Sequence, residues 1–373
     1  MTRFIPEITP NGGTVFGNSY VSLFASCPRA WFNSFLRPGI EGNTADNDYL
    51  PGGSGSDRED YPPATQGIKP RFTKSALLVG RLFHEGMAAL YLSGCRDGQD
   101  TGEWNIDEAI AVMHGHWNKA LDEYESQDEA DLDWFGKPPP RKKMGLEEML
   151  RMYYDEVGPH AENPDFPNIQ VVHDGNGEPL VERELALDLN YRGYIYTCRP
   201  DLIITQSGYL KVMEHKTSAS KMWANERLEA FHTDSQITGE IFVLRALFPD
   251  EKIEGVLGNV IVKSPGPKTP FIMRETGRRR DLDLEHFRLA TIDVLRDIDR
   301  RVDGFQLDVS ADIKIEMAMA RWFPDHGTRT GHCNKYRGCF FLALCANKGR
   351  EEQMLGDYVP RTKVEVQTSQ SQP

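Results

Sequence analysis

The sequence predicts an α/β protein in which helices wrap a mixed central sheet of four or five strands. Strand-like runs are confined mainly to residues 168–215, where β-rich segments alternate with Gly, Asn and Ser turn signals. Apolar residues recur at helical spacing on both sides of that region. The helical stretches are 17–36, 73–92, 106–125, 145–157, 222–247, 283–304 and 311–321. Helices, a short meander and more helices fit one domain, which we place at residues 1–360.

Two stretches are predicted to lie outside the packed core. Residues 38–70 are dominated by Gly, Pro, Ser, Asp and Asn and show no apolar periodicity, which is typical of a flexible insertion. Residues 361–373 form a polar C-terminal segment that we expect to be a flexible tail. The rest of the 373-residue chain, 39% hydrophobic overall, is long enough to bury a large core.

Hydropathy and charge limit the classes of function. No apolar run approaches the ~18 residues of a membrane span, and MTRFIPEITPNGG lacks the apolar stretch of a secretory signal. We therefore expect a cytoplasmic protein with no membrane partner. The formal net charge of −13 is unfavourable for nucleic-acid binding, but local charge matters more than the sum. Basic clusters at 141–143, 277–280 and 296–301 could contact phosphates or simply be solvated helix faces.

The segment CRPDLIITQSGYLKVMEHKTS (198–218) is the most informative for chemistry. Two β-rich runs flank QSG, which predicts a hairpin with Asp201 early in its first strand. Side chains alternate along a strand, so Glu214 and Lys216 point the same way and His215 points the opposite way. Two carboxylates can hold a hard divalent ion, and the ammonium of Lys216 can orient a water or stabilise developing charge. Ordinary surface charges on an exposed hairpin are the alternative.

These residues resemble the PD-(D/E)XK nuclease superfamily, specifically its RecB-like branch. Pro200-Asp201 matches the PD element and Glu214-His215-Lys216 matches (D/E)XK, although Cys198-Arg199 stands where that branch often has a glycine. The resemblance implies a restriction-endonuclease-like fold.

An upstream helix carries Gly80-Arg81-Leu82-Phe83-His84, which fits the G-x-x-x-H context of that branch. The resemblance implies that His84, Asp201, Glu214 and the main-chain carbonyl of His215 bind Mg²⁺ or Mn²⁺. Taken alone, a histidine on an apolar helix is more often a satisfied core residue.

Further positions follow from the same resemblance. Gln236 is the candidate for the Q-x-x-x-Y glutamine, with Glu240 where tyrosine is usual. Glu184 matches a frequent acidic position just upstream, and an outward-facing strand charge is an equal reading of it.

Three of the six cysteines lie within residues 331–345, and in a cytoplasmic protein clustered cysteines more often bind metal than form disulfides. A subset of RecB-like nucleases resembles this chain in a first helix with Cys-Pro-Arg and a C-terminal trio that together hold a [4Fe–4S] cluster. That resemblance implies Cys27, Cys333, Cys339 and Cys345 as ligands, with 330–346 as the cluster segment joining the helical N- and C-terminal parts. The x5 gap between Cys333 and Cys339, where x2 is usual, leaves Zn²⁺ or unligated cysteines open.

The resemblance implies a metal-dependent DNA exonuclease acting on single strands or duplex ends, in phage-type recombination or repair, in a bacterial host or encoded by a phage. DNA is the expected partner, with a recombination or helicase protein as a second. The candidate backbone contacts are Arg29, Arg278, Arg279 and Arg280. The main alternative is a catalytically silent nucleic-acid-binding or assembly module stabilised by the cluster. Another metallohydrolase or tRNA-processing activity on the same fold is a third reading.

Overall fold

The structure is a computed structural model. It describes residues 15–35, 68–70, 75–96, 98–123, 145–158, 169–218, 220–263, 271–325, 333, 339, 341–346 and 358–360. The predicted insertion at 38–70, apart from 68–70, and the predicted tail at 361–373 lie outside these residues. The described chain divides into two compact units. The first is built mainly from 72–187 and 198–287, and the second from 7–71, 188–197 and 288–373. The single domain over 1–360 stays a prediction.

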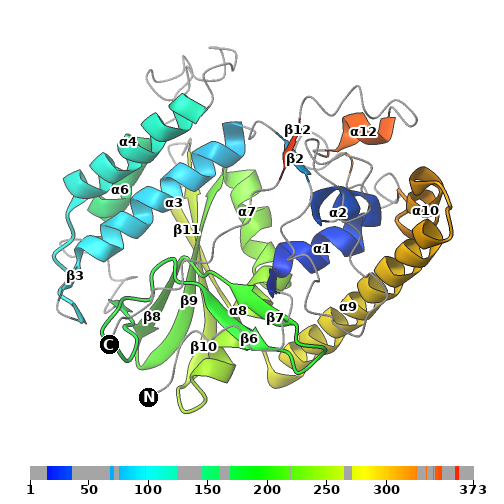
Figure 1. Cartoon of the computed structure of the whole chain (residues 1–373). Helices are drawn as coiled ribbons and strands as arrows, with labels where there is room; N and C mark the ends of the chain where they lie inside the picture. The colour runs from blue at the N-terminus through cyan, green and yellow to red at the C-terminus, as the bar shows by residue number, and fades with distance from the viewer. Residues whose placement is uncertain are drawn as a thin grey trace, which may run out of the picture. The chain divides into compact units, whose positions relative to one another are not determined.

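A five-stranded mixed sheet forms the centre of the first unit (Figure 1). Its order is β11 (Ile272–Gly277), β10 (Ile253–Val262), β9 (Tyr209–Ser218), β8 (Leu202–Gln206) and β5 (Gln170–Val171). β10 runs parallel to β9, and the other neighbours are antiparallel. The mixed α/β class is confirmed. The prediction that strands stay mainly within 168–215 is wrong, because β10 and β11 lie beyond it. β10 is buried on both faces, so its sequence lacks the alternation that marks a half-buried strand.

The predicted hairpin is present as β8 and β9, with Gln206 opposite Tyr209. Ser207 and Gly208 both adopt left-handed backbone conformations, with φ of 53° and 77°. Two positive φ angles in a two-residue loop are the requirement of the tight turn that matches strand twist. The same register pairs Leu202 with Met213.

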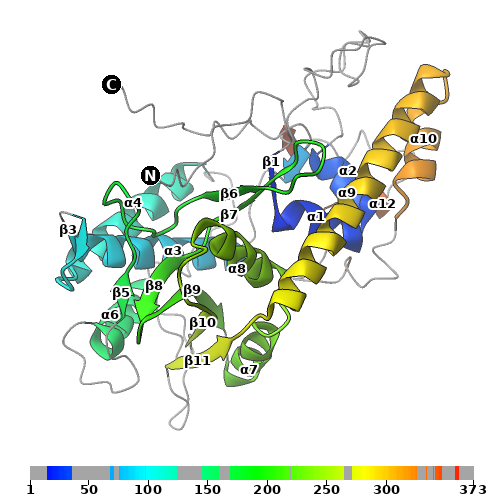
Figure 2. The same ribbon diagram turned by 90° about the horizontal axis from the view of Figure 1, so that it is seen from below.

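Helices cover both faces of this sheet (Figures 1 and 2). α3 (Ser75–Ser93), α4 (Ile106–Glu123) and α6 (Leu146–Val157) pack together over one face. Their core residues include Leu82, Leu90 and Leu150, each 0% exposed, and these join Met213 and Leu257 of the sheet. The opposite face carries α7 (Lys221–Ala230) and α8 (Ser235–Leu247).

The helix predicted at 222–247 is therefore two helices. Asp234 caps α8, since its carboxylate accepts a hydrogen bond from the backbone N–H of Gln236 at 2.7 Å. A capping aspartate satisfies an otherwise unpaired backbone donor and so favours a new helix start. Next to it, the guanidinium of Arg279 donates to the carbonyl of Phe231 at 2.8 Å, just after α7 ends. Elsewhere, the short strands β3 (Cys95–Arg96) and β4 (Gln99–Asp100) pair with each other. Strand β6 (Leu185–Asp188) is a neighbour of β7 in a separate small sheet.

The second unit is mainly helical. It contains α1 (Asn18–Ser26), α2 (Pro28–Phe35), most of α9 (Asp281–Ser310), α10 (Ile315–Trp322) and α12 (Leu342–Ala346). β1 (Val15–Gly17) pairs in parallel with β7 (Ile195–Cys198), and β2 (Ile68–Pro70) pairs with β12 (Tyr358–Pro360). The helix predicted at 17–36 breaks at Cys27, which precedes a proline and has extended backbone angles. Trp31 fills this core against Tyr20, Phe24 and Phe323.

Among the described helices, none combines the length and the apolar character that crossing a lipid bilayer requires.

Candidate active site

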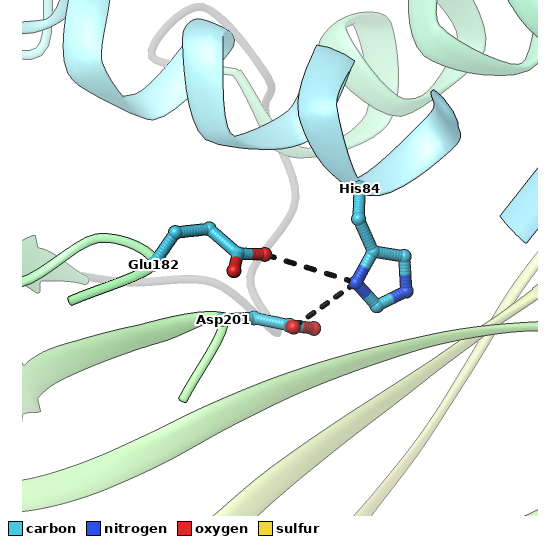
Figure 3. Close-up of side chains that lie close together, drawn as sticks. All are labelled: His84, Glu182 and Asp201. Carbon is cyan, nitrogen blue, oxygen red and sulfur yellow. Dashed lines mark hydrogen bonds and ion pairs between the residues drawn. The ribbon is translucent and has the colours of Figure 1, made fainter. Parts of the chain in front are cut away.

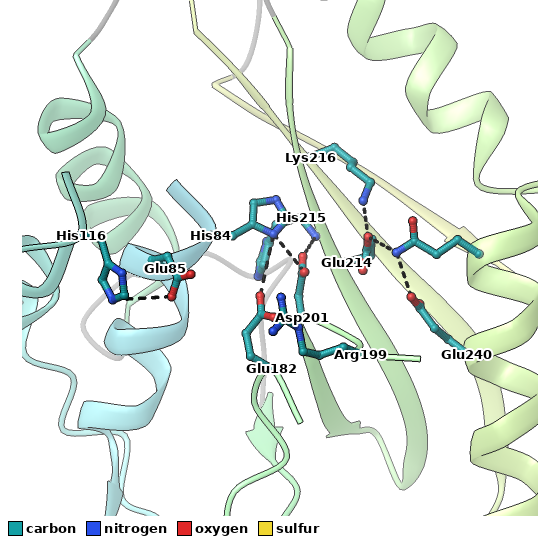
Figure 4. Close-up of polar contacts among 11 residues, drawn as sticks. His84, Glu85, His116, Glu182, Arg199, Asp201, Glu214, His215, Lys216 and Glu240 are labelled. Carbon is teal, nitrogen blue, oxygen red and sulfur yellow. Dashed lines mark hydrogen bonds and ion pairs between the residues drawn. The ribbon is translucent and has the colours of Figure 1, made fainter. Parts of the chain in front are cut away.

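Two acidic side chains meet where β8 begins and β9 approaches its end (Figure 4). Asp201 directly precedes β8, and its Oδ2 accepts a hydrogen bond of 2.6 Å from the backbone N–H of His215. Glu214 is 1% exposed and forms an ion pair with Lys216 on the same strand face. The backbone geometry of the hairpin therefore presents a buried acid, a second acid and an ammonium together, as the spacing predicted.

A third element adds a histidine (Figure 3). His84 projects from the middle of α3, and its Nδ1 lies 3.0 Å from Asp201 Oδ1 and 4.0 Å from Glu182 Oε1. One ligand atom of each of the three residues lies within 4.8 Å of the other two. One imidazole and two carboxylates at this spacing could hold a divalent metal ion.

Glu182 is the residue that sequence reasoning missed. Val181 bridges Leu202 in an antiparallel sense, and the N–H of Glu182 donates to the carbonyl of Asp201 at 2.9 Å. The pairing sets Glu182 beside Asp201, with a left-handed φ of 47°. Glu184, the residue considered from the resemblance, is exposed. Only the register with which residues 181–184 pair with β8 would have identified Glu182, and a single sequence does not show that register.

Burial and charge shift the proton affinities of this group. Burial lowers the pKa of His84, but the adjacent Asp201 carboxylate more than reverses this and raises it to about 8. Burial raises the pKa of Asp201, and the nearby His84 cation outweighs it, so the net shift is well downward. Burial, followed by repulsion from Asp201, raises the pKa values of Glu182 and Glu214 to about 7 each. The group therefore carries protons at neutral pH, chiefly on His84.

Gln236 of α8 joins Glu214 to a further acid, Glu240. Its Nε2 donates to Glu214 Oε1 at 3.2 Å and to Glu240 Oε1 at 2.9 Å. Glu240 is 1% exposed, and burial together with repulsion from Glu214 raises its pKa well above the usual value. Glu240 therefore fixes which way the Gln236 amide faces, a role that a neutral acid can fill as a hydrogen-bond acceptor.

The imidazole of His215 lies on the opposite face of β9, as strand alternation predicted. Its ring stacks on Tyr91 with 5.9 Å between centroids, and its Nδ1 lies 3.3 Å from the Asn259 amide nitrogen. Burial lowers the pKa of His215 to about 3, so the ring is neutral. The hydroxyls of Tyr91 and Tyr153 are 2.6 Å apart in the same buried network. This packing holds the strand segment whose N–H positions Asp201.

The four predicted cluster cysteines lie in the second unit. Cys27 is 2% exposed and packs with Cys339 in a small apolar cluster that includes Phe341 and Leu344. Electrostatic repulsion from Cys27 contributes to raising the pKa values of Cys333, Cys339 and Cys345, after the larger effect of burial. The backbone N–H of Phe341 donates to the Cys339 sulfur at 3.4 Å. The fold thus gathers all four thiols in one neighbourhood.

The spacing of these sulfurs bears on what they could bind. Among the described residues, no three of them approach within 4.8 Å of one another. A single tetrahedral zinc with Zn–S bonds of about 2.3 Å would need sulfurs about 3.8 Å apart. The described sulfur positions therefore do not form a ready-made site for a single zinc ion. Cys95 and Cys198, the remaining cysteines, are partly buried in the first unit.

The candidate phosphate-contacting arginines divide into two kinds. Arg29 and Arg279 are 8% and 5% exposed and donate to main-chain carbonyls, at 2.8 Å to Phe323 and 2.8 Å to Phe231. Both side chains therefore connect segments of the fold, and their contact with DNA stays a prediction. Arg278 and Arg280 are exposed, but they pair with Glu254 and Asp283.

The active-site donors fit a hard divalent ion. Carboxylate oxygens and one imidazole are the ligands that Mg²⁺ and Mn²⁺ accept. Glu214 Oε2 is buried and has no hydrogen-bond partner within the described chain. A buried carboxylate oxygen left without a partner is costly, and a cation would remove that cost.

A model of the PD-(D/E)XK nuclease superfamily matches residues 58–346, more than three quarters of the chain. No curated protein matches it. Among solved structures, the crystal structure of SSO0001 is similar at 16% sequence identity, over 58% of this chain and 84% of that one. Its TM-score of 0.25 is too low to support any conclusion about fold.

Proposed function

This chain belongs to the PD-(D/E)XK nuclease superfamily, and on that premise we propose that it is a metal-dependent DNA exonuclease acting on single strands or duplex ends. The observation that carries the proposal is the meeting of His84, Glu182 and Asp201 beside the Glu214–Lys216 pair. The imidazole and the carboxylates can bind a metal ion, and the ammonium of Lys216 can stabilise negative charge. Helix α3, the start of β8 and strand β9 supply His84, Asp201 and the Glu214–Lys216 pair.

His84, Glu182, Asp201 and Glu214 would hold Mg²⁺ or Mn²⁺, with the main-chain carbonyl of His215 as a further oxygen. When bound, such an ion polarises a phosphoryl oxygen and lowers the pKa of water. The chain prepares the site by holding Asp201 in place through the His215 N–H. His84 must be neutral to offer its ring nitrogen, so binding displaces protons from the cluster.

Lys216 supplies positive charge next to the reacting phosphate. Burial lowers the pKa of Lys216, but Glu214 and Asp201 raise it more, so the side chain stays charged. A fixed ammonium in a buried site stabilises negative charge that develops in the transition state. Gln236 holds Glu214 from the other side, which keeps that carboxylate beside Lys216.

We also propose that Cys27, Cys333, Cys339 and Cys345 hold a [4Fe–4S] cluster that cross-links the N-terminal and C-terminal parts of the second unit. The support is that Cys27 packs with Cys339 and lies near enough to Cys333 and Cys345 to influence their thiols, although 306 positions separate Cys27 from Cys333. Closing so long a loop costs only slightly more than closing a medium one, and a cluster bound only by the folded state adds its binding free energy to stability.

The nuclease proposal is tested with end-labelled linear DNA, single- and double-stranded, in Mg²⁺ or Mn²⁺. Wild type should release nucleotides from linear strands and leave closed single-stranded circles intact. Glu214→Ala and Lys216→Ala should lower the rate by about 10²–10⁴-fold. Equal cleavage by wild type and both variants would show that these residues are not the active site. Cleavage of circles would make the enzyme an endonuclease.

The cluster is tested on protein purified without oxygen, by iron content and visible absorption. Cys345→Ser should lose colour, solubility and activity together. A colourless Cys345→Ser protein that stays folded and cleaves normally would show that no cluster is needed to hold the fold together. If wild type binds DNA but cleaves nothing in either metal, the binding-module alternative gains support. The proposed setting in phage-type recombination or repair rests on the family resemblance alone.

A further inference from the structure

The first turn of α7 exposes an unusual set of side chains. Lys221, Met222 and Trp223 are all exposed, and Met222 and Trp223 show 60% and 54% of their surfaces to solvent. The face of α7 that packs on β9, β10 and β11 is supplied instead by Ala224 and Leu228. Neither large apolar side chain is therefore used for core packing. A large exposed aromatic is informative because burying it would normally stabilise the fold.

This turn directly follows the catalytic strand. β9 carries Lys216 and ends at Ser218, and α7 begins at Lys221 (Figure 1). Chain geometry limits the distance between the backbones of Lys216 and Trp223 to about 20 Å, a span of a few nucleotides of extended single strand. A strand whose phosphate lies at Lys216 can therefore reach Trp223.

The charge of the turn suits a polyanion. Its first residue is Lys221, and the first turn of α7 contains no acidic residue. Farther along the helix Glu226 and Glu229 are exposed, so only the first turn is favourable to phosphate. The turn is thus a cation followed by two apolar side chains, which suits a nucleotide better than it suits an apolar protein surface.

The charge of the chain makes base stacking a more important source of DNA affinity than phosphate contacts. The net charge is −13, and the exposed arginines 278 and 280 are already paired with carboxylates. Affinity from phosphate contacts alone would be weak at physiological salt. Stacking of a base on an aromatic ring supplies affinity that does not depend on salt to the same degree.

We infer that Trp223, flanked by Met222, is a stacking platform for a base of the strand that enters the active site, and that it makes the enzyme select unpaired DNA. A paired base inside a duplex has both faces covered by its neighbours, whereas a single strand or a frayed end offers a free face. This inference rests on the proposed nuclease function and adds the substrate class to it.

The first test measures binding of fluorescein-labelled oligo(dT) in EDTA, so that no cleavage occurs. Trp223→Ala should weaken binding by about 5- to 100-fold, and Trp223→Phe, which keeps a ring, should stay within about threefold. The matched control is Met317→Ala on α10, a side chain 61% exposed on a different helix, which should bind like wild type. The loss caused by Trp223→Ala should persist when salt is raised.

The second test measures cleavage of single-stranded and blunt duplex DNA. Trp223→Ala should raise KM for the single strand more than it lowers kcat, and should reduce the preference for single strands. Equal oligo(dT) binding by wild type, Trp223→Ala and Met317→Ala overturns the platform even if the nuclease is active. Absence of oligo(dT) binding by wild type also overturns it. If Trp223→Ala instead changes the oligomeric state on size-exclusion chromatography, the patch is a protein contact and the inference is wrong.

Discussion

Metal binding at the acidic cluster should release protons, and His84 is the main source. Its pKa is about 8, and only the neutral ring can donate an electron pair to a metal. For a group with that pKa, competition from protons weakens apparent metal affinity by about 100-fold at pH 6 and about twofold at pH 8. The expected result is an affinity that rises about 50-fold between pH 6 and pH 8 from His84 alone.

Glu182 adds to this slope in the same direction. Its pKa of about 7 implies a further gain of about tenfold over the same range, because its carboxylate must also be ionised to bind a cation. Asp201 adds nothing in this window, since its pKa is displaced downward and it is already ionised. Glu214, whose pKa is also about 7, adds a further gain of about tenfold for the same reason. The product of the three gains is an upper limit, because the protonation of each group depends on the charge of its neighbours.

The assay is isothermal titration calorimetry with Mn²⁺ at pH 6, 7 and 8, in pairs of buffers with different ionisation enthalpies. The difference between buffers gives the number of protons released. Wild type should release about two protons per ion at pH 7, about one from His84 and about one shared by Glu182 and Glu214. His84→Gln should bind more weakly at pH 8 and show a shallower pH dependence. An affinity that is independent of pH, or an equal slope for wild type and His84→Gln, would refute the reasoning.

Substitutions at four further positions test the packing around the site. Gly258→Ala should lower the free energy of unfolding by about 1–3 kcal/mol in chemical denaturation, because its Cβ would lie 2.1 Å from the Phe231 ring. Gly80→Ala, in a helix and with nothing within 4 Å of its Cβ among the described residues, should be neutral or stabilise by up to about 1 kcal/mol. Glu240→Leu should raise Tm, because it removes a buried acid, yet lower kcat through loss of the glutamine contact, whereas Glu240→Gln should keep kcat closer to wild type. Arg279→Ala should lower the free energy of unfolding by about 2 kcal/mol or more, since it removes the donor to the Phe231 carbonyl and to the Thr238 hydroxyl, and a loss below about 0.5 kcal/mol would contradict its structural role.

The hairpin and the arrangement of its side chains were predictable from the local sequence pattern. A two-residue turn with Gly208 and strict alternation along β9 fix which side chains share a face, and both are short-range properties. That is why the relation of Glu214 to Lys216 was predictable. The break between α7 and α8 near Phe231 was missed because apolar residues recur at helical spacing across it. The features that mark the break are the capping Asp234 and a buried arginine from another segment, Arg279.

The sequence by itself determined the α/β class, the hairpin and the shared face of Glu214 and Lys216, since residue type and spacing within one element carry that information. Only the tertiary structure decided that Glu182 rather than Glu184 faces His84, that Glu240 orients Gln236, and that Arg29 and Arg279 are buried against main-chain carbonyls. These outcomes depend on the register between strands and on which segment packs over which face. Such contacts join residues far apart in the chain, and no local period encodes them.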